Sequence, residues 1–212
     1  MKNTLAGLAK PAAILTFVLA TLTAANADEV RFIGTTMGRF DLQSFANANT
    51  FLDLAYSSSN FDNTTDDGFL GLGGNPSPGT NFNNLGSFSL GITKHSYSGH
   101  TFDLEVTFTA PVTIDGGDTT QFHANLVGSV TDIRHGGVFI DFDNTPQFFT
   151  FSNSTASGAF SFSVNDLSIA PGQVASVTGT ILGSQQPVPE PASVALVLIG
   201  LAGVVRLHRR TA

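Results

Sequence analysis

The sequence predicts an all-β fold, namely a single antiparallel β-sandwich or jelly-roll-like domain over residues 28–184. Three observations lead to this prediction. Apolar and polar residues alternate in several segments, which is the period-two pattern of a strand with one buried face. Clusters of Gly, Asn, Asp and Ser interrupt these segments at short spacing, as turns do. No segment between residues 28 and 187 carries the apolar stripe of an amphipathic helix.

The first strands are expected at residues 30–34, 51–55 and 88–93, where the alternation is short. The clearest strand is expected at residues 101–109, because its alternation has no break. Its buried face would hold Phe102, Leu104, Val106 and Phe108. Asp103 and Glu105 would lie on the opposite face, exposed to solvent.

The later part of the domain repeats this pattern. Further strands are expected at residues 121–133, 138–142, 147–151, 159–164 and 173–182. Turn residues separate them, as in Asp143-Asn144-Thr145-Pro146 and Pro171-Gly172. We expect Gln185-Gln186-Pro187 to form a short linker after the domain.

Residues 60–84 break the pattern and predict a long, polar, Gly-rich loop. The loop contains three clustered carboxylates, Asp62, Asp66 and Asp67. Hard cations prefer clustered oxygen ligands, so these residues are candidate ligands for calcium. The spacing does not match an EF-hand, because Gly74 stands where that loop needs a bidentate Glu. A solvated acidic turn is the alternative interpretation, in which no cofactor binds.

The C-terminal tail has three parts in order. Val188-Pro189-Glu190-Pro191 is an extended segment, since each proline disfavours helix in the residue before it. An uncharged, mostly apolar run follows at residues 192–205 and predicts a single transmembrane helix over residues 192–207. Basic residues close the tail, at Arg206, Arg209 and Arg210. Their long side chains can snorkel to the membrane surface.

This tail resembles the PEP-CTERM sorting signal, and the resemblance covers about the last 25 residues. It implies processing by an exosortase, a membrane protease of exopolysaccharide-producing Gram-negative bacteria. The segment Pro189-Glu190-Pro191 would be the feature that the protease recognises. The resemblance implies that residues 185–212 direct sorting of the protein and are processed. It does not imply an activity for the domain.

The N-terminus predicts a secretory signal peptide over residues 1–27. Lys2 and Lys10 are positively charged, an apolar stretch follows, and Ala25-Asn26-Ala27 is an A-x-A cleavage site. The expected partners are therefore signal peptidase and the export machinery. The domain would be exported while the basic C-terminus stays cytoplasmic, as the positive-inside rule requires.

The predicted mature domain is acidic. Of 16 Asp and Glu residues only Glu190 lies outside residues 28–187, which leaves 15 acidic against 4 basic residues and a net charge of −11. Such a charge disfavours nucleic acid and anionic membranes as partners. The chain contains no cysteine, so its stability cannot depend on disulfides.

No residue pattern in the domain predicts catalysis. The four histidines of the domain are scattered and are expected in surface loops: His95, His100, His123 and His135. Asp103 and Glu105 are expected on an open strand face, whereas glycosidase carboxylates oppose each other across a cleft. We therefore predict that the protein is not an enzyme.

The sequence predicts an exported structural protein of the cell surface or biofilm matrix, anchored as a precursor and processed by an exosortase. A carbohydrate- or calcium-binding adhesin is the alternative, with exopolysaccharide as a possible partner. The domain has no Trp and two Tyr, and Tyr97 is the candidate platform for stacking a sugar. A secreted hydrolase is a third class, which would need the acidic loop to fold over a cleft.

Overall fold

The computed structural model describes residues 29–77, 79–154 and 156–187; the predicted signal peptide and the tail from residue 188 lie outside this part. The described residues form sixteen strands and no helix, which confirms the predicted all-β class. None of these residues therefore forms a helix that could cross a membrane. The predicted transmembrane run at residues 192–207 is not among them.

The largest sheet has eight strands. Its spatial order is β14 (Leu167–Ile169), β11 (His135–Phe142), β10 (Thr119–Asp132), β9 (His100–Ala110), β1 (Arg31–Phe40), β4 (Ser59–Thr64) and β6 (Asn81–Phe82). The short strand β8 (His95–Ser96) pairs with β10 outside this order. All pairs in this sheet are antiparallel except β4 with β6, which is parallel.

Two smaller sheets have four strands each. The first has the order β12 (Gln147–Ser152), β13 (Ala156–Val164), β16 (Gly179–Pro187) and β5 (Phe69–Leu72). The second has the order β15 (Val174–Ser176), β7 (Ser87–Leu90), β3 (Leu54–Ser57) and β2 (Ala48–Phe51). Both sheets are antiparallel throughout.

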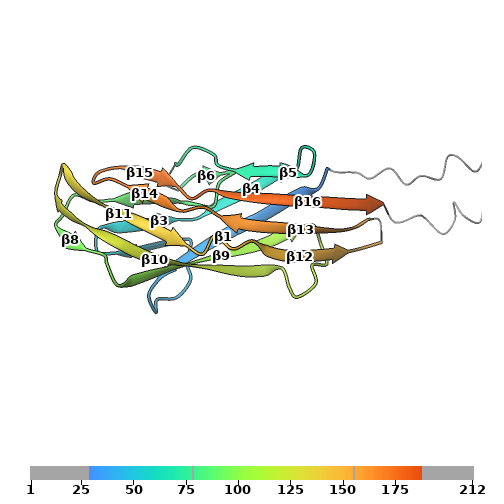
Figure 1. Ribbon diagram of the computed structural model, residues 1–212, viewed down its shortest axis with the longest axis horizontal. Helices are drawn as coiled ribbons and strands as arrows, with labels where there is room; N and C mark the ends of the chain where they lie inside the picture. Colours follow the sequence, from blue (N-terminus) through green and yellow to red (C-terminus); the bar gives the residue numbers. More distant parts are fainter. Residues whose placement is uncertain (1–28, 78, 155, 188–212) are drawn as a thin grey trace, which may run out of the picture.

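The three sheets form two packed layers, because rings of the large sheet contact rings of each small sheet. Phe108 on β9 lies 5.3 Å from Phe160 on β13, measured between ring centroids. Phe102, also on β9, lies 5.0 Å from Tyr56 on β3 and 4.8 Å from Phe88 on β7. The two small sheets are therefore placed one after the other along the large sheet (Figure 1).

The alternation predicted for residues 101–109 is confirmed on its apolar side. Phe102, Leu104, Val106 and Phe108 are each at most 2% exposed. The prediction for Asp103 is wrong, since only 15% of its side chain is exposed. Arg39 and His123 flank Asp103 from the neighbouring strands β1 and β10 and cover it.

The prediction of one long loop at residues 60–84 is also wrong. Most of β4, with all of β5 and β6, lies within this segment. Short apolar stretches around Phe61 and Leu70 supply the buried residues of these strands. They are too short to stand out among the Gly and Asn residues of the sequence, but neighbouring strands pair with them.

Two predictions near the end of the domain need correction. The strand predicted at residues 173–182 is split between β15 and β16, which belong to different sheets. The linker predicted at residues 185–187 is wrong, because β16 continues to Pro187 and pairs with β13 as far as Ala156. The described domain therefore extends beyond the predicted boundary at residue 184.

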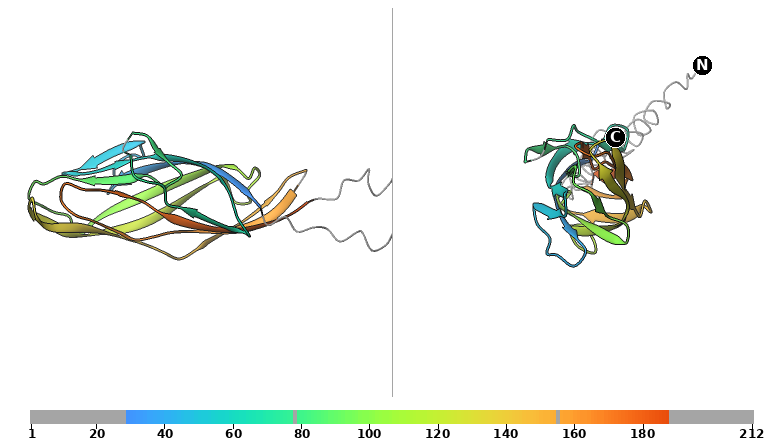
Figure 2. Two further views of the ribbon diagram at one scale, coloured as in Figure 1. Left: turned by 90° about the horizontal axis from the view of Figure 1, so that it is seen from above. Right: turned by 90° about the vertical axis from the view of Figure 1, so that its left-hand side faces the viewer.

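The folded body is elongated, and the N-terminal end of β1 and the C-terminal end of β16 lie at the same pole (Figures 1 and 2). At this pole, Gln185 donates a hydrogen bond of 2.6 Å from Nε2 to the carbonyl oxygen of Glu29. The turn between β10 and β11 and the strand β8 lie at the opposite pole (Figure 1). The sorting tail therefore begins next to the N-terminal end of the domain.

Candidate functional site

The three predicted metal ligands are not brought together. Asp62 lies on β4 and forms an ion pair of 2.7 Å with Arg31 on β1. The Arg31 guanidinium holds the pKa of the Asp62 carboxyl below its ordinary value. Asp66 and Asp67 lie in the tight turn between β4 and β5, where Asp66 bonds the backbone of Phe69. Within residues 29–77, 79–154 and 156–187, no three His, Asp or Glu side chains form a group that could hold a metal ion.

All four histidines of the domain lie on strands rather than in the predicted loops, and three of them contact a carboxylate. His100 contacts Asp41 at 2.9 Å. His123 contacts Asp103 at 2.7 Å, and His135 contacts Asp132 at 2.7 Å. These pairs are separate, because each His–Asp contact uses a different aspartate.

Two of these aspartates have lowered pKa values. The Arg134 backbone N–H and His135 hold the pKa of Asp132 below its ordinary value. Burial acts to raise the pKa of Asp41, but hydrogen bonds from Thr101 and His100 outweigh it and lower the pKa overall. The ionised form of each carboxylate is therefore favoured by its local hydrogen bonds.

The predicted sugar platform at Tyr97 is wrong, because this side chain is 0% exposed. Tyr56 is 1% exposed, and its hydroxyl lies 2.9 Å from Thr36 Oγ1 and 3.0 Å from the Leu85 carbonyl oxygen. Both tyrosines therefore belong to the core. Neither ring can stack on a ligand at the surface.

The exposed aromatic surface lies instead on the sheet β12–β13–β16–β5. Phe148 is 82% exposed, Leu182 is 54% exposed and Phe69 is 53% exposed. The strand register places them in one row, since Phe148 pairs with Ser161, Ser161 with Leu182, and Leu182 with Phe69. We call this row of four residues on the outer side of the sheet the apolar face.

The sheet has this face because three strands carry two large apolar residues in succession. These doublets are Phe69-Leu70, Phe148-Phe149 and Ile181-Leu182. Adjacent side chains of a strand point to opposite sides, so each doublet directs one side chain inward and one outward. Leu70 and Ile181 are buried, and Phe149 packs against the core. This signal was present in the sequence, and it could have revealed the apolar face.

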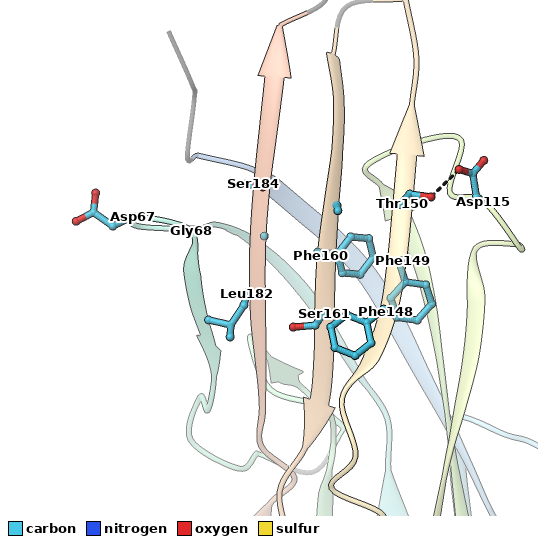
Figure 3. A pocket seen from close by; sticks show the side chains of 12 residues that line it. Asp67, Gly68, Asp115, Phe148, Phe149, Thr150, Phe160, Ser161, Leu182 and Ser184 are labelled. Carbon is cyan, nitrogen blue, oxygen red and sulfur yellow. Dashed lines mark hydrogen bonds between the residues drawn. The ribbon is translucent and has the colours of Figure 1, made fainter.

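A shallow, open hollow of about 760 Å³ lies next to the row (Figure 3). Phe149 and Phe160 line it, and their rings are stacked at 4.8 Å between centroids. Asp67 and Asp115 lie at its two sides in Figure 3. Thr150 donates a hydrogen bond of 2.6 Å to Asp115 Oδ2. The two carboxylates therefore form a polar rim around an apolar centre.

The four strands of this sheet contain no ionisable side chain. The outer side of the large sheet is different, since the ionisable side chains of Arg39, Asp103 and His123 form a row there. The apolar face is thus an uncharged surface on a domain with 15 acidic residues. An exposed apolar patch with a polar rim is typical of an interaction site.

The strand β16 connects this sheet to the tail. Leu182 of the apolar face lies on the same strand as Pro187, the last residue that the structure describes. Residues 187–210 match the family described as the PEP-CTERM protein-sorting motif. The tail is a PEP-CTERM sorting motif. Its first residue is the last residue of β16, so the motif follows the folded domain directly.

The PEP-CTERM motif confirms the predicted nature of the tail and identifies the chain as an exported exosortase substrate with a membrane-anchored precursor. The match covers residues 187–210, which form the tail. No curated protein and no solved structure matches the chain. The sorting residues Val188 to Pro191, the basic residues at the C-terminus and the cleavage site at Ala25 and Ala27 lie outside the described residues.

Proposed function

We propose that this protein is a structural component of the cell surface or of an exopolysaccharide-associated biofilm matrix, exported through its signal peptide and processed by an exosortase. The observation that carries the proposal is the PEP-CTERM motif at residues 187–210. The precursor is anchored by the apolar run at residues 192–207, and the mature chain is the acidic β-sandwich in front of it. Signal peptidase and the exosortase are its processing partners.

The shape of the domain supports this role. Because both ends of the described domain lie at one pole, the tail begins on the same side of the body as the N-terminal end of the domain (Figure 2). A chain anchored by its tail would therefore hold the turn between β10 and β11 away from the membrane. The acidic surface would limit contact with anionic lipids and nucleic acid.

The proposed role is structural rather than enzymatic. Asp103, one of the two carboxylates considered for glycoside hydrolysis, accepts hydrogen bonds from Arg39 and His123. Glu105, the other, accepts a hydrogen bond of 3.0 Å from Gln121 Nε2. Both lie on one open face of the large sheet, whereas glycosidase carboxylates face each other across the substrate.

A carbohydrate- or calcium-binding adhesin is the second candidate. The exposed rings of the apolar face favour its carbohydrate-binding form, since aromatic faces can pack against sugar rings. A glycan array probed with the mature protein, with and without calcium, separates the two candidates. Saturable glycan binding supports the adhesin, and its absence supports the structural role.

Intact mass of the protein from the surface fraction tests the processing. We expect a chain that begins at Asp28 and ends within or beside residues 188–191. Glu190→Ala should leave a longer precursor in the membrane fraction, because the substitution alters the segment that the resemblance assigns to the protease. Gln186→Ala, one residue before the motif, is the matched control and should be processed normally. Surface protein that retains residues 192–212 would contradict the proposed processing.

A further inference from the structure

We propose that the apolar face binds the same face of a second copy of this chain, with the two copies side by side and both sorting tails at the same end. The inference goes beyond the proposed function, because it depends on the folded domain and not on the processing of its tail. It assigns a partner to the exposed row on β12, β13, β16 and β5.

The order of large and small side chains in the row favours this pairing. Across the sheet the order is Phe148, Ser161, Leu182 and Phe69. A two-fold axis that runs along the strands reverses this order in the second copy. Leu182 then lies opposite Ser161 of the second copy, and Phe148 lies opposite Phe69. A large side chain faces a small one at the centre, and two aromatic rings meet on each side.

The other two-fold arrangement fits less well. An axis across the strands would place each residue opposite itself, so that Leu182 would meet Leu182 and Ser161 would meet Ser161. Large side chains would collide while small ones would leave a gap, and both defects weaken packing. Size complementarity therefore selects the side-by-side arrangement. In that arrangement the β16 strands end at the same pole, as two chains attached to one surface require.

Charge restricts where a second copy of the chain can approach. Two domains of net charge −11 repel each other over most of their surfaces. The strands under the apolar face carry no ionisable side chain, so two copies can approach there without opposing charges at the centre. Asp115 and Asp67 lie at opposite rims of the hollow (Figure 3). The side-by-side arrangement would therefore bring Asp115 of one copy near Asp67 of the other. Salt should strengthen the association, since it screens this repulsion.

The area of the sheet predicts a weak contact. Four strands about 4.8 Å apart and about six residues long present a face of roughly 400 Å². A stable interface usually buries about 800 Å² on each partner. Association should therefore depend on a high local concentration. Chains anchored in one surface have such a concentration, because tethering makes the contact effectively intramolecular.

Site-directed cross-linking of the full-length chain in its exporting cell tests the proposal. The chain has no cysteine, so each introduced thiol is unique. Two tagged versions are produced together, one with Ser161→Cys and one with Leu182→Cys, and treated with a short bismaleimide. We expect the mixed pair to cross-link several-fold more than Ser161→Cys paired with itself. Equal yields from both combinations would overturn the side-by-side arrangement.

Substitution of exposed rings tests the face itself. Adding Phe148→Ser and Phe69→Ser to both tagged chains should reduce the cross-link at least fivefold, whereas Asp67→Asn should increase it. The matched control is Val127→Ser with Phe139→Ser, an exposed apolar pair on the large sheet, which should leave the yield unchanged. Equal protease resistance of all variants shows that they fold.

Two results would refute the proposal. The first is a cross-link that survives Phe148→Ser with Phe69→Ser. The second is absence of the cross-link between the Ser161→Cys and Leu182→Cys chains that carry no further substitution. Release of the Phe148→Ser, Phe69→Ser variant from polysaccharide-coated cells would then assign the face to a glycan. The cross-link is measured in both the precursor and the processed chain, so neither result depends on cleavage by the exosortase.

Discussion

Phe108 shows how single residues join the two layers. It lies on β9 of the large sheet and is 2% exposed. Its ring makes edge-on contacts with five others: Phe32, Phe61, Phe149, Phe160 and Phe162. Edge-to-face pairs add to the stabilisation that comes from burial alone. Many of the nineteen phenylalanines serve this purpose in a domain without disulfides.

Phe108→Ala should therefore lower the free energy of unfolding by about 3–5 kcal/mol, because it removes buried surface and leaves a cavity. Glu105→Ala is the control on the same strand, and it should cost less than about 1 kcal/mol since its side chain contacts Gln121 at the surface. Urea denaturation of the mature protein measures both. Similar costs for the two variants would show that the alternation does not define the core.

Asp103 shows what a single-strand pattern cannot reveal. Its position in the alternation was predicted correctly as the outer side of β9. Its partial burial depends on Arg39 from β1, 2.8 Å away, and on His123 from β10, 2.7 Å away. These residues are 64 and 20 positions distant in the sequence. Only the pairing of the three strands brings them together.

At the scale of elements, β16 connects the domain to the sorting motif. Its last residues pair with the start of β13, from Gly158 with Gln185 to Ala156 with Pro187. Gln185 also bonds the backbone of Glu29 and so joins the two ends of the described domain. Polar residues such as Gln185 and Gln186 suggest a linker when they are considered alone. However, the backbone N–H and C=O groups of any residue other than proline can pair with a neighbouring strand, whichever side chain it carries.

Ending the mature chain at Ser184 should therefore reduce the free energy of unfolding by about 1–3 kcal/mol relative to a chain that ends at Pro187, since several backbone hydrogen bonds are lost at about 1 kcal/mol each. Urea denaturation of the two chains measures the difference. A chain that ends at Pro191 is the control and should match the chain that ends at Pro187. Equal stability of the chains ending at Ser184 and Pro187 would restore the interpretation of 185–187 as a linker.

At the scale of the whole molecule, acidic residues are numerous and several depend on specific partners. Arg31 lowers the pKa of Asp62, and hydrogen bonds from the Thr145 side chain and backbone lower that of Asp143. Hydrogen bonds from Thr93 lower the pKa of Asp53. A carboxyl whose pKa is lower in the folded state than in the unfolded state stabilises the fold when ionised. The effect is present above the unfolded pKa and is lost as the pH falls through the folded pKa.

We therefore expect the free energy of unfolding to fall steeply once the pH drops below about 3.8, the ordinary pKa of these aspartates. Urea midpoints measured between pH 7 and pH 2.5 test this. Asp62→Asn should lower stability at neutral pH and make the acid-induced loss smaller, because one of the linked carboxyls is absent. Asp118→Asn, in the turn before β10, serves as the control. A stability that does not change between pH 4 and pH 2.5 would exclude this linkage.

The sequence by itself determined the all-β class, the strand at residues 101–109 and the PEP-CTERM tail. These features depend on local order along the chain: a period of two in a strand, and three adjoining segments in the tail. The tertiary structure alone decided the strand neighbours, the burial of Tyr97, the partial burial of Asp103, the separation of Asp62 from Asp66 and Asp67, and the row from Phe148 to Phe69. The physical reason is that the alternation within one strand predicts which of its side chains lie on the same face of the sheet. Which strand lies beside it depends on packing between residues far apart in the sequence.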